Sequence, residues 1–310
     1  MNDIPFPEVI DNSLVSAFQE CPTKCFNEYF QHWKPKTPNV HLHAGGAYAR
    51  GLEVARLNFF GESRPERESV AAGAKALVEA YVPFECPPDS AKSLERMLGA
   101  FEFYFDQYPM GSDTATPYKF ADGRLGVEFN FVEPLDVMHP DTGQPLLYTG
   151  RFDMLCDYQG GVYGEDDKTA SQLGASWSRQ WDLRAQFTGY CWGAKKHKLP
   201  IMGFLIRGVS ILKTKYDTQQ AITYRAPWQI EEWYENLCDS ILPDMIHQWE
   251  KSRAAQRSQW KMALGEACNQ FGGCPFKQVC LAEPTNRLSW LETKFERRRW
   301  DPVTRVETML

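Results

Sequence analysis

The sequence contains no apolar run that approaches the ~20 residues needed for a membrane-spanning helix. Its first residues, MNDIPFPEVIDNS, also lack the basic and then apolar layout of a secretory signal peptide. The nine cysteines are an odd number, which together with the missing signal peptide argues against a disulfide framework. We therefore expect a cytoplasmic protein that does not engage a membrane.

An excess of basic residues is missing as well, because the formal net charge is −6. A protein that coats nucleic acid non-specifically is normally basic, so that class is disfavoured. A protein that binds nucleic acid in one channel is not excluded, because only the nearby charges matter there. Apolar residues make up 43% of the chain and aromatic residues 14%, which excludes a disordered protein and allows a large core.

Hydrophobic periodicity gives the order of the expected elements. Helical patterns cover residues 13–33, 44–61, 66–82, 89–107, 176–197 and 227–256. Strand patterns cover residues 124–134, 144–158, 160–170 and 201–216, and residues 218–226 are expected to pair with the last of these. A cysteine segment and a charged tail end the chain. This order predicts an α/β fold in which helices flank a mixed central sheet, with a helical insertion over residues 62–115.

Four consecutive charged residues lie in the middle of the strand-like segment VYGEDDKTA, Val162–Ala170. Alternate residues of a strand point to the same face, so Asp166 and Lys168 should point the same way. Asp167 should point to the opposite face. The preceding strand carries Asp153 in GRFDML, and a hairpin turn at YQGG would bring Asp153 close to Asp166.

Two carboxylates and a lysine that converge in this way have a specific chemical use. Asp153 and Asp166 can bind Mg²⁺ or Mn²⁺, which prefer oxygen ligands, and a bound metal activates water and neutralises phosphate charge. Lys168 can orient or activate that water and stabilise the transition state. Glu128 in GVEFNF can add a third carboxylate or orient a metal-bound water. A lone D-x-K is usually a pair of solvated charges, but here Asp153, the hairpin and the following helix agree.

These motifs resemble those of the PD-(D/E)XK nuclease superfamily, in particular its RecB-like exonuclease branch. That branch includes CRISPR-associated iron–sulfur exonucleases and phage nucleases. The family pattern is a strand with Asp, a strand with (D/E)-x-K-T and a helix with Q-x-x-x-Y, and GRFDML, DDKT and QFTGY supply it here in that order. The matching residues are Asp153, Asp166, Lys168, Thr169, Gln186 and Tyr190. The segment SLVSAFQECPTK also looks like the opening segment of the family.

The resemblance spans roughly residues 13–285 and implies a single nuclease domain over residues 1–310 with a restriction-endonuclease-like core. It implies a metal-dependent exonuclease that hydrolyses phosphodiester bonds from single-stranded or duplex DNA ends. Gln186 and Tyr190 would position the DNA strand. Phage or mobile-element recombination, with a recombination or CRISPR-related protein as partner, is the setting that the resemblance suggests.

Two positions depart from the family pattern. Ala49 in GGAYARGLE stands where the family has a metal-binding His. His41 and His43 are expected to precede that helix, and Glu53 could compensate. Asp167 occupies a position that is usually apolar, so the face to which it points is either wet or meets a cationic partner. These departures favour an alternative function, a catalytically weak binding module with the nuclease fold that engages a protein or a nucleic acid.

Three cysteines near the end of the chain follow the spacing C-x5-C-x5-C, and thiolates so spaced can converge on a metal. The resemblance implies that a cysteine of the N-terminal segment completes the set. A [4Fe-4S] cluster would then join terminal segments 1–35 and 260–285 through Cys21, Cys268, Cys274 and Cys280. Zinc bound by the same thiolates is one alternative. Cysteines buried as small apolar residues, with no metal, are another.

Overall fold

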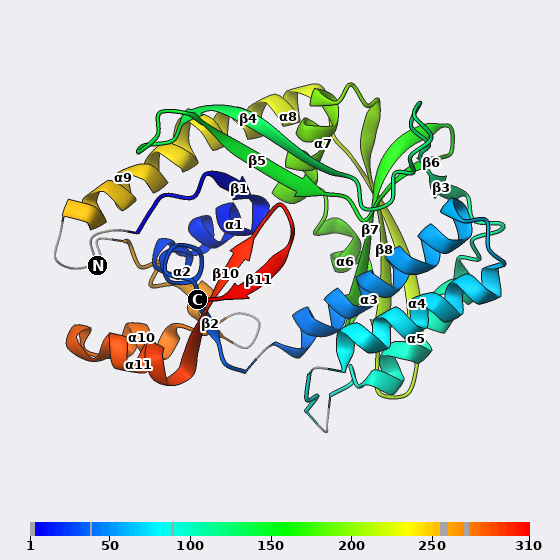
Figure 1. Cartoon of the computed structure of the whole chain (residues 1–310), viewed down its shortest axis with the longest axis horizontal. Coiled ribbons are helices and arrows are strands. Elements are labelled where there is room, and N and C mark those ends of the chain that lie inside the picture. The colour runs from blue at the N-terminus through cyan, green and yellow to red at the C-terminus, as the bar shows by residue number, and fades with distance from the viewer. Residues whose placement is uncertain (1–3, 38, 83, 88–89, 255–259, 270–272) are drawn as a thin grey trace. The chain divides into compact units, whose positions relative to one another are not determined.

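The computed structural model describes residues 4–37, 39–82, 84–87, 90–254, 260–269 and 273–310 (Figure 1). Its Cα positions divide the chain into two compact units. The terminal unit comprises residues 1–37, 131–150 and 231–310, and the central unit comprises residues 38–130 and 151–230. Both units thus draw on segments that are far apart in the sequence.

A five-stranded mixed sheet of order β3-β6-β7-β8-β9 lies at the middle of the central unit. Its strands are β3 (Ala115–Pro117), β6 (Met154–Tyr158), β7 (Gly161–Ala170), β8 (Ile201–Ile211) and β9 (Tyr216–Tyr224). Strand β7 pairs antiparallel with β6 and parallel with β8, and β9 pairs antiparallel with β8 as expected. The expected turn joins β6 to β7, where Gln159 and Gly160 have positive φ angles of 49° and 81°.

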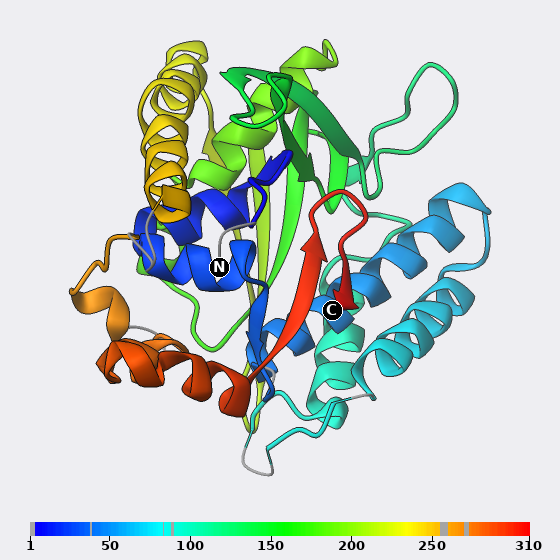
Figure 2. The same ribbon diagram turned by 60° about the vertical axis from the view of Figure 1, so that its left-hand side comes forward.

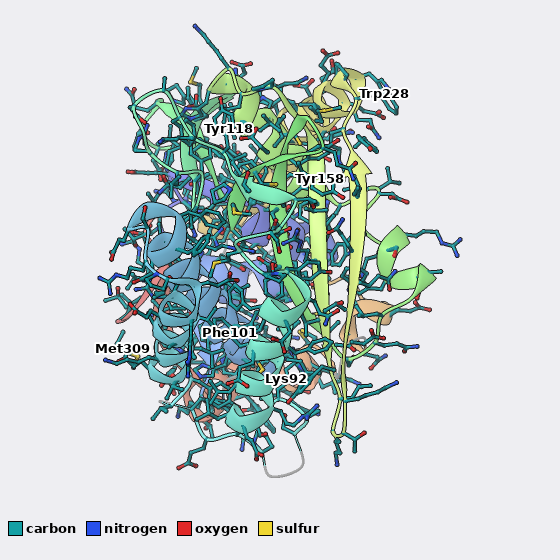
Figure 3. All side chains as sticks on the ribbon, turned by 90° about the vertical axis from the view of Figure 1, so that its right-hand side faces the viewer. Lys92, Phe101, Tyr118, Tyr158, Trp228 and Met309 are labelled. Carbon is teal, nitrogen blue, oxygen red and sulfur yellow. The ribbon has the colours of Figure 1, made fainter. Side chains whose placement is uncertain are left out.

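Helices cover both faces of this sheet (Figure 1). On one face lie α3 (Val40–Arg56) with its π-helical extension Leu57–Gly61, α4 (Glu66–Tyr81) and α5 (Leu94–Gln107). Their core cluster includes Phe101, labelled in Figure 3, and Val209 of β8. On the other face lie α6 (Ala175–Arg179) and α7 (Ala185–Lys196), where Phe187 stacks on Phe204 at a centroid distance of 4.4 Å. The α/β class and the mixed sheet flanked by helices are thereby confirmed.

The beginning of helix α3 and its packing against α4 follow from particular residues of the helix. The Asn39 side chain accepts a hydrogen bond from the His41 amide at 2.8 Å and caps the helix. The helix therefore begins at Val40, so His41 and His43 lie within it and the prediction that they precede it is wrong. Further along, α3 and α4 pack backbone against backbone, because a Cβ on Gly73 would lie 2.6 Å from the Gly51 carbonyl oxygen.

The terminal unit contains most of the other elements. One sheet has the order β1-β5-β4, and another has the order β11-β10-β2, with the β10–β11 hairpin in red in Figure 2. These strands are β1 (Val9–Asp11), β2 (Trp33–Pro35), β4 (Asn130–Met138), β5 (Pro145–Arg151), β10 (Phe295–Asp301) and β11 (Val306–Met309). None of the helices in the described part of the chain has the length and apolar character needed to cross a membrane.

The remaining helices form two groups along the sequence. The first group is α1 (Asn12–Glu20), α2 (Pro22–Cys25) and the π-helical Phe26–Phe30. The second is α8 (Pro227–Glu235), the π-helical Asn236–Ile241, α9 (Leu242–Ala254), the 3₁₀ turns Glu266–Cys268 and Pro284–Asn286, α10 (Lys277–Leu281) and α11 (Arg287–Lys294). The expected charged tail forms α11 and the β10–β11 hairpin. At the beginning of this hairpin, the buried Phe295 ring stacks on Phe276 at a centroid distance of 4.8 Å.

Three expected elements are broken in the structure. Residues 144–158 form two strands in different sheets, and Phe152, which lies between them, donates its amide to the Phe129 carbonyl oxygen at 2.8 Å. Residues 124–134 become a regular strand only from Asn130. Residues 176–197 form α6 and α7, separated by a turn. In each case the periodicity was present, but tertiary hydrogen bonding interrupts the element.

Candidate active site

The two faces of β7 have different surroundings. Gly164, Asp166 and Lys168 point to the α7 face, as expected from the alternation of a strand. Gly164 is required there, because a Cβ at this position would lie 2.4 Å from the Phe204 ring and 2.7 Å from that of Phe152. The glycine lets two aromatic rings pack on the strand directly before the acidic residues.

Asp166 and Lys168 form an ion pair on this face. Oδ2 of Asp166 lies 2.5 Å from Nζ of Lys168, and the carboxylate side chain is buried. Burial raises the pKa of Asp166 to about 6 against the opposing charge of Lys168, and Asp153 adds to the rise. For Lys168, burial lowers the pKa, but the carboxylates of Asp166 and Asp153 outweigh it and the net shift is upward. Lys168 is therefore a charged ammonium at neutral pH.

Asp153 reaches the same place from the bend between β5 and β6. The last residue pair of the β6–β7 ladder is Met154 with Glu165. Beyond it, Oδ2 of Asp153 accepts a hydrogen bond from the backbone amide of Asp167 at 3.1 Å. The Asp153 carboxylate thus replaces the next backbone acceptor of the β6–β7 ladder. This hydrogen bond turns the Asp153 side chain toward Asp166. The sequence prediction placed Asp153 on a strand, whereas the structure places it in the bend before one.

Helix α7 brings the other two predicted residues to this face. Nε2 of Gln186 donates to the Tyr190 hydroxyl at 3.4 Å, which agrees with their spacing of one helical turn. The Tyr190 ring is buried and lies 5.2 Å from the Phe152 ring and 6.2 Å from the Phe204 ring, centroid to centroid. Tyr190 is near enough to Lys168 to act on its pKa. Tyr190 therefore adjoins Lys168, and Gln186 is linked to it through the Tyr190 hydroxyl.

Glu128 lies beside the group, in a turn before β4 and not on a strand, with a positive φ of 53°. Its amide donates to the Asp153 carbonyl oxygen at 3.0 Å, so it helps to hold the bend. Its Oε2 lies 2.6 Å from Nε of Arg151. The structure thus places Glu128 next to Asp153 and gives its carboxylate a cationic neighbour.

The donor set suits a hard divalent cation. Mg²⁺ is usually bound by one or two protein carboxylates, with waters and substrate phosphates completing the shell. Asp153 and Asp166 supply such a pair. Oδ2 of Asp166 contacts the Lys168 ammonium at 2.5 Å, so a bound metal would share this carboxylate with the lysine. Among the described residues, no three His, Cys, Asp or Glu side chains are arranged as a ready-made metal-binding group.

The opposite face of β7 meets buried cations. Nη1 of Arg56 donates to Oδ2 of Asp167 at 2.8 Å, and Nη2 donates to Oε1 of Glu165 at 2.5 Å. Arg207 lies 3.6 Å from the same Glu165 oxygen. Of the two possibilities that the sequence left open, this face meets a cationic partner, and the partner is within the chain. The charge of Asp167 was the signal for such a partner, but no sequence feature pointed to Arg56 or Arg207.

Glu53, the expected substitute for the missing family His, and the nearby His43 have other contacts. Nε2 of His43 lies within hydrogen-bonding distance of the Tyr81 carbonyl oxygen, at 2.9 Å. Oε1 of Glu53 pairs with Nη1 of Arg50 at 2.6 Å. Ala49 is partly buried on α3. In the described part of the chain, the side chains of His43 and Glu53 therefore pair with Tyr81 and Arg50 and not with Asp153 or Asp166.

The four predicted cysteine ligands lie together in the terminal unit. They line one pocket with about 430 Å³ of empty space, part of it open to solvent, and Lys24 and Phe276 also line it. Burial raises the pKa of the Cys274 and Cys280 thiols, and the neighbouring cysteines raise both further. The chain thus brings Cys21 to the three C-terminal thiols. Their soft donor character suits an iron–sulfur cluster or zinc.

Comparisons with known proteins give only distant likenesses. No protein-family model matches the sequence, and no curated protein matches it. Among solved structures, the chain is similar to a proposed exonuclease from Eubacterium rectale, with a TM-score of 0.48 and 13% sequence identity over 89% of this chain and 93% of that one. It is also similar to the protein SSO0001, with a TM-score of 0.27 and 14% identity over 72% of this chain and 82% of that one. At these scores neither likeness assigns a fold or an activity.

Proposed function

We propose that the protein is a metal-dependent deoxyribonuclease that hydrolyses phosphodiester bonds from DNA ends. One observation carries the proposal. Asp153 and Asp166 converge with Lys168 on one face of β7, and the Gln186–Tyr190 pair of α7 adjoins them. Paired carboxylates, a charged lysine and adjacent amide and hydroxyl donors are what the hydrolysis of a phosphodiester requires.

The charge and the position of each side chain indicate its role in the proposed reaction. Asp153 and Asp166 would hold Mg²⁺ or Mn²⁺, which when bound supplies an activated water and neutralises phosphate charge. Lys168 is an ammonium, so it orients that water or stabilises negative charge in the transition state and does not act as a base. Gln186 and Tyr190 donate hydrogen bonds to the DNA strand. Glu128 holds the Asp153 bend through its backbone amide.

We further propose a [4Fe-4S] cluster on Cys21, Cys268, Cys274 and Cys280. The support is that all four line one pocket in the terminal unit, from positions far apart in the sequence, although the thiols of these described residues are not arranged as a ready-made metal-binding group. Its role would be structural, because ligation at both chain ends constrains the unfolded state and adds binding energy to folding. Zinc on the same thiolates would serve the same role, and metal analysis of anaerobically purified protein distinguishes iron, zinc and neither.

A second function has one observation in its favour. The family His is replaced by Ala49, and Glu53 is already paired with Arg50. A site with only two carboxylate ligands would bind metal weakly, and the protein would then serve as a nuclease-fold module that binds a protein or a nucleic acid. The ionised Lys168 beside Asp166 favours the enzyme instead.

The test is digestion of end-labelled linear DNA, single-stranded and duplex, with Mg²⁺ or Mn²⁺. The wild type should degrade it and Asp166→Ala should not, whereas Asp157→Asn, an exposed acid on neighbouring β6, should behave as wild type. The label pattern gives polarity, and a circular single-stranded substrate separates an exonuclease from an endonuclease. If cluster-intact wild type cuts with neither metal, the enzyme proposal is wrong and the binding module replaces it.

A further inference from the structure

Arg56 holds two alternate residues of β7 from the buried side of the sheet. Its guanidinium donates to Asp167 at 2.8 Å and to Glu165 at 2.5 Å, and these residues lie directly before and after Asp166. Arg56 and Glu165 are only 4% and 0% exposed. A third hydrogen bond, from Nη2 to the Tyr104 hydroxyl at 2.8 Å, fixes the plane of the guanidinium.

From Asp166 onward, β7 is hydrogen-bonded to a neighbouring strand along one edge only. Pairing with β6 stops at Glu165, whereas pairing with β8 continues through Asp166 and Asp167 to Ala170. On the open side, the Asp167 amide donates to Oδ2 of Asp153 at 3.1 Å. Two groups therefore determine the direction of the Asp167 amide. One is the pairing of β7 with β8, and the other is Arg56, which bonds the Asp167 side chain.

We propose that Arg56 is a positioning residue for the metal-binding pair. Its bonds to Glu165 and Asp167 fix the backbone on both sides of Asp166 and so orient the Asp166 side chain. They also orient the Asp167 amide, which donates to Asp153. This inference rests on the proposed metal site. Arg56 lies on the face of β7 opposite to Asp166, so it acts through the strand that lies between it and the site.

Stability alone is a poor explanation for this arrangement. Burying charges costs free energy that apolar residues of similar size would not cost, so a buried ion pair is weak evidence for stability. A planar guanidinium instead provides direction, because its donors lie in a fixed fork that matches two acceptors at once. Lysine at the same position keeps the charge but cannot reproduce the fork.

The experiment measures Mn²⁺ affinity by calorimetry, with folding checked by the melting temperature. Arg56→Lys should weaken Mn²⁺ binding about 10- to 100-fold, the usual effect of losing a group that orients a metal ligand. Arg207→Lys is the matched control, because Arg207 is also buried and its side chain pairs with Glu165 and Asp113 instead of Asp167. It should lower the melting temperature and leave the Mn²⁺ affinity unchanged.

A second pair of variants keeps the inference testable if Arg56→Lys does not fold. Asp167→Ala removes one of the acids of the buried network and leaves the arginines paired with Glu165 and Asp113, so it should fold. It should weaken Mn²⁺ binding by about tenfold or more. Asp167→Asn keeps an acceptor for Nη1 of Arg56 and should restore affinity close to that of the wild type.

The outcomes separate this inference from the proposed function. If folded Arg56→Lys or Asp167→Ala binds Mn²⁺ as tightly as the wild type, Arg56 does not position the site and the inference is wrong. Equal weakening by Arg207→Lys also refutes it, because the effect would then be general loosening of the core. If the wild type binds Mn²⁺ but cuts no DNA, the nuclease function alone fails. If the wild type binds no Mn²⁺, both are wrong.

Discussion

Lys92 is buried without a carboxylate partner among the contacts of the described residues, so replacing it should stabilise the protein at neutral pH. Its side chain is 4% exposed, and Nζ donates to Oγ1 of Thr169 at 2.5 Å, at the end of β7. Burial lowers its pKa from 10.5 to about 8. The perturbation is Lys92→Met, which keeps the length and the apolar stem but removes the charge.

The sign follows from proton linkage. The pKa of Lys92 is lower in the folded state, so between about pH 8 and pH 10.5 the unfolded chain binds more protons and stability rises with pH. The cost is full below about pH 8 and is roughly 3 kcal/mol, from about 1.36 kcal/mol per pKa unit. Methionine removes that cost but loses a hydrogen bond worth about 1 kcal/mol. Lys92→Met should therefore gain about 2 kcal/mol at pH 7 and nothing at pH 10.

The assay is urea unfolding of both proteins at pH 7 and pH 10 under reducing conditions. The difference between the two proteins is the quantity of interest, because buried tyrosines and cysteines with raised pKa destabilise both equally at high pH. Lys75→Met, at an exposed lysine of α4, should show no pH-dependent difference. A Lys92→Met advantage that is absent at pH 7, or that persists unchanged at pH 10, would refute the reasoning.

Three further predictions concern the site, the strand and the cysteines. Lys168→Met should lower the rate of DNA hydrolysis by about 10²- to 10³-fold without weakening DNA binding, as initial rates and a binding titration would show; a normal rate contradicts its role. Gly164→Ala should lower the free energy of unfolding by about 1–3 kcal/mol, because the added Cβ meets the Phe204 ring, whereas Gly46→Ala, in open space on α3, should raise it by about 0.5–1 kcal/mol in the same urea experiment. Cys268→Ser should reduce bound iron below the about four atoms per chain of a [4Fe-4S] cluster, and a wild type with zinc or no metal would refute the cluster.

The sequence was informative where the determinant is local. The alternation of β7 placed Asp166 and Lys168 on one face, and the one-turn spacing of Gln186 and Tyr190 is seen on α7. Such patterns depend only on the period of a strand or a helix. The hairpin turn at Gly160 was equally readable, because few residues adopt its backbone conformation.

The sequence was silent where the determinant is tertiary. Arg56 meets Asp167 across 111 residues, and nothing in the helical pattern around it distinguishes a buried arginine from a solvated one. The break before Asp153 was missed for the same reason, because residues 144–158 have a strand-like pattern and the bonds of this bend, from Phe152 to Phe129 and from Glu128 to Asp153, are tertiary. Periodicity reports which face a residue occupies, but not what covers that face.

Each face of β7 carries an excess of one negative charge, and the two faces differ in what can compensate it. On the α7 face, two carboxylates and Lys168 leave a formal charge of −1, and the site is partly open, so a divalent cation can compensate it. On the α3 face, Glu165, Asp167 and Asp113 pair with Arg56 and Arg207 and also leave a formal charge of −1. A proton can compensate this charge, because burial raises the pKa of Glu165 to about 7. If the proposed metal is bound, it would therefore lie on the α7 face, because two arginines and a proton already compensate the acids of the α3 face.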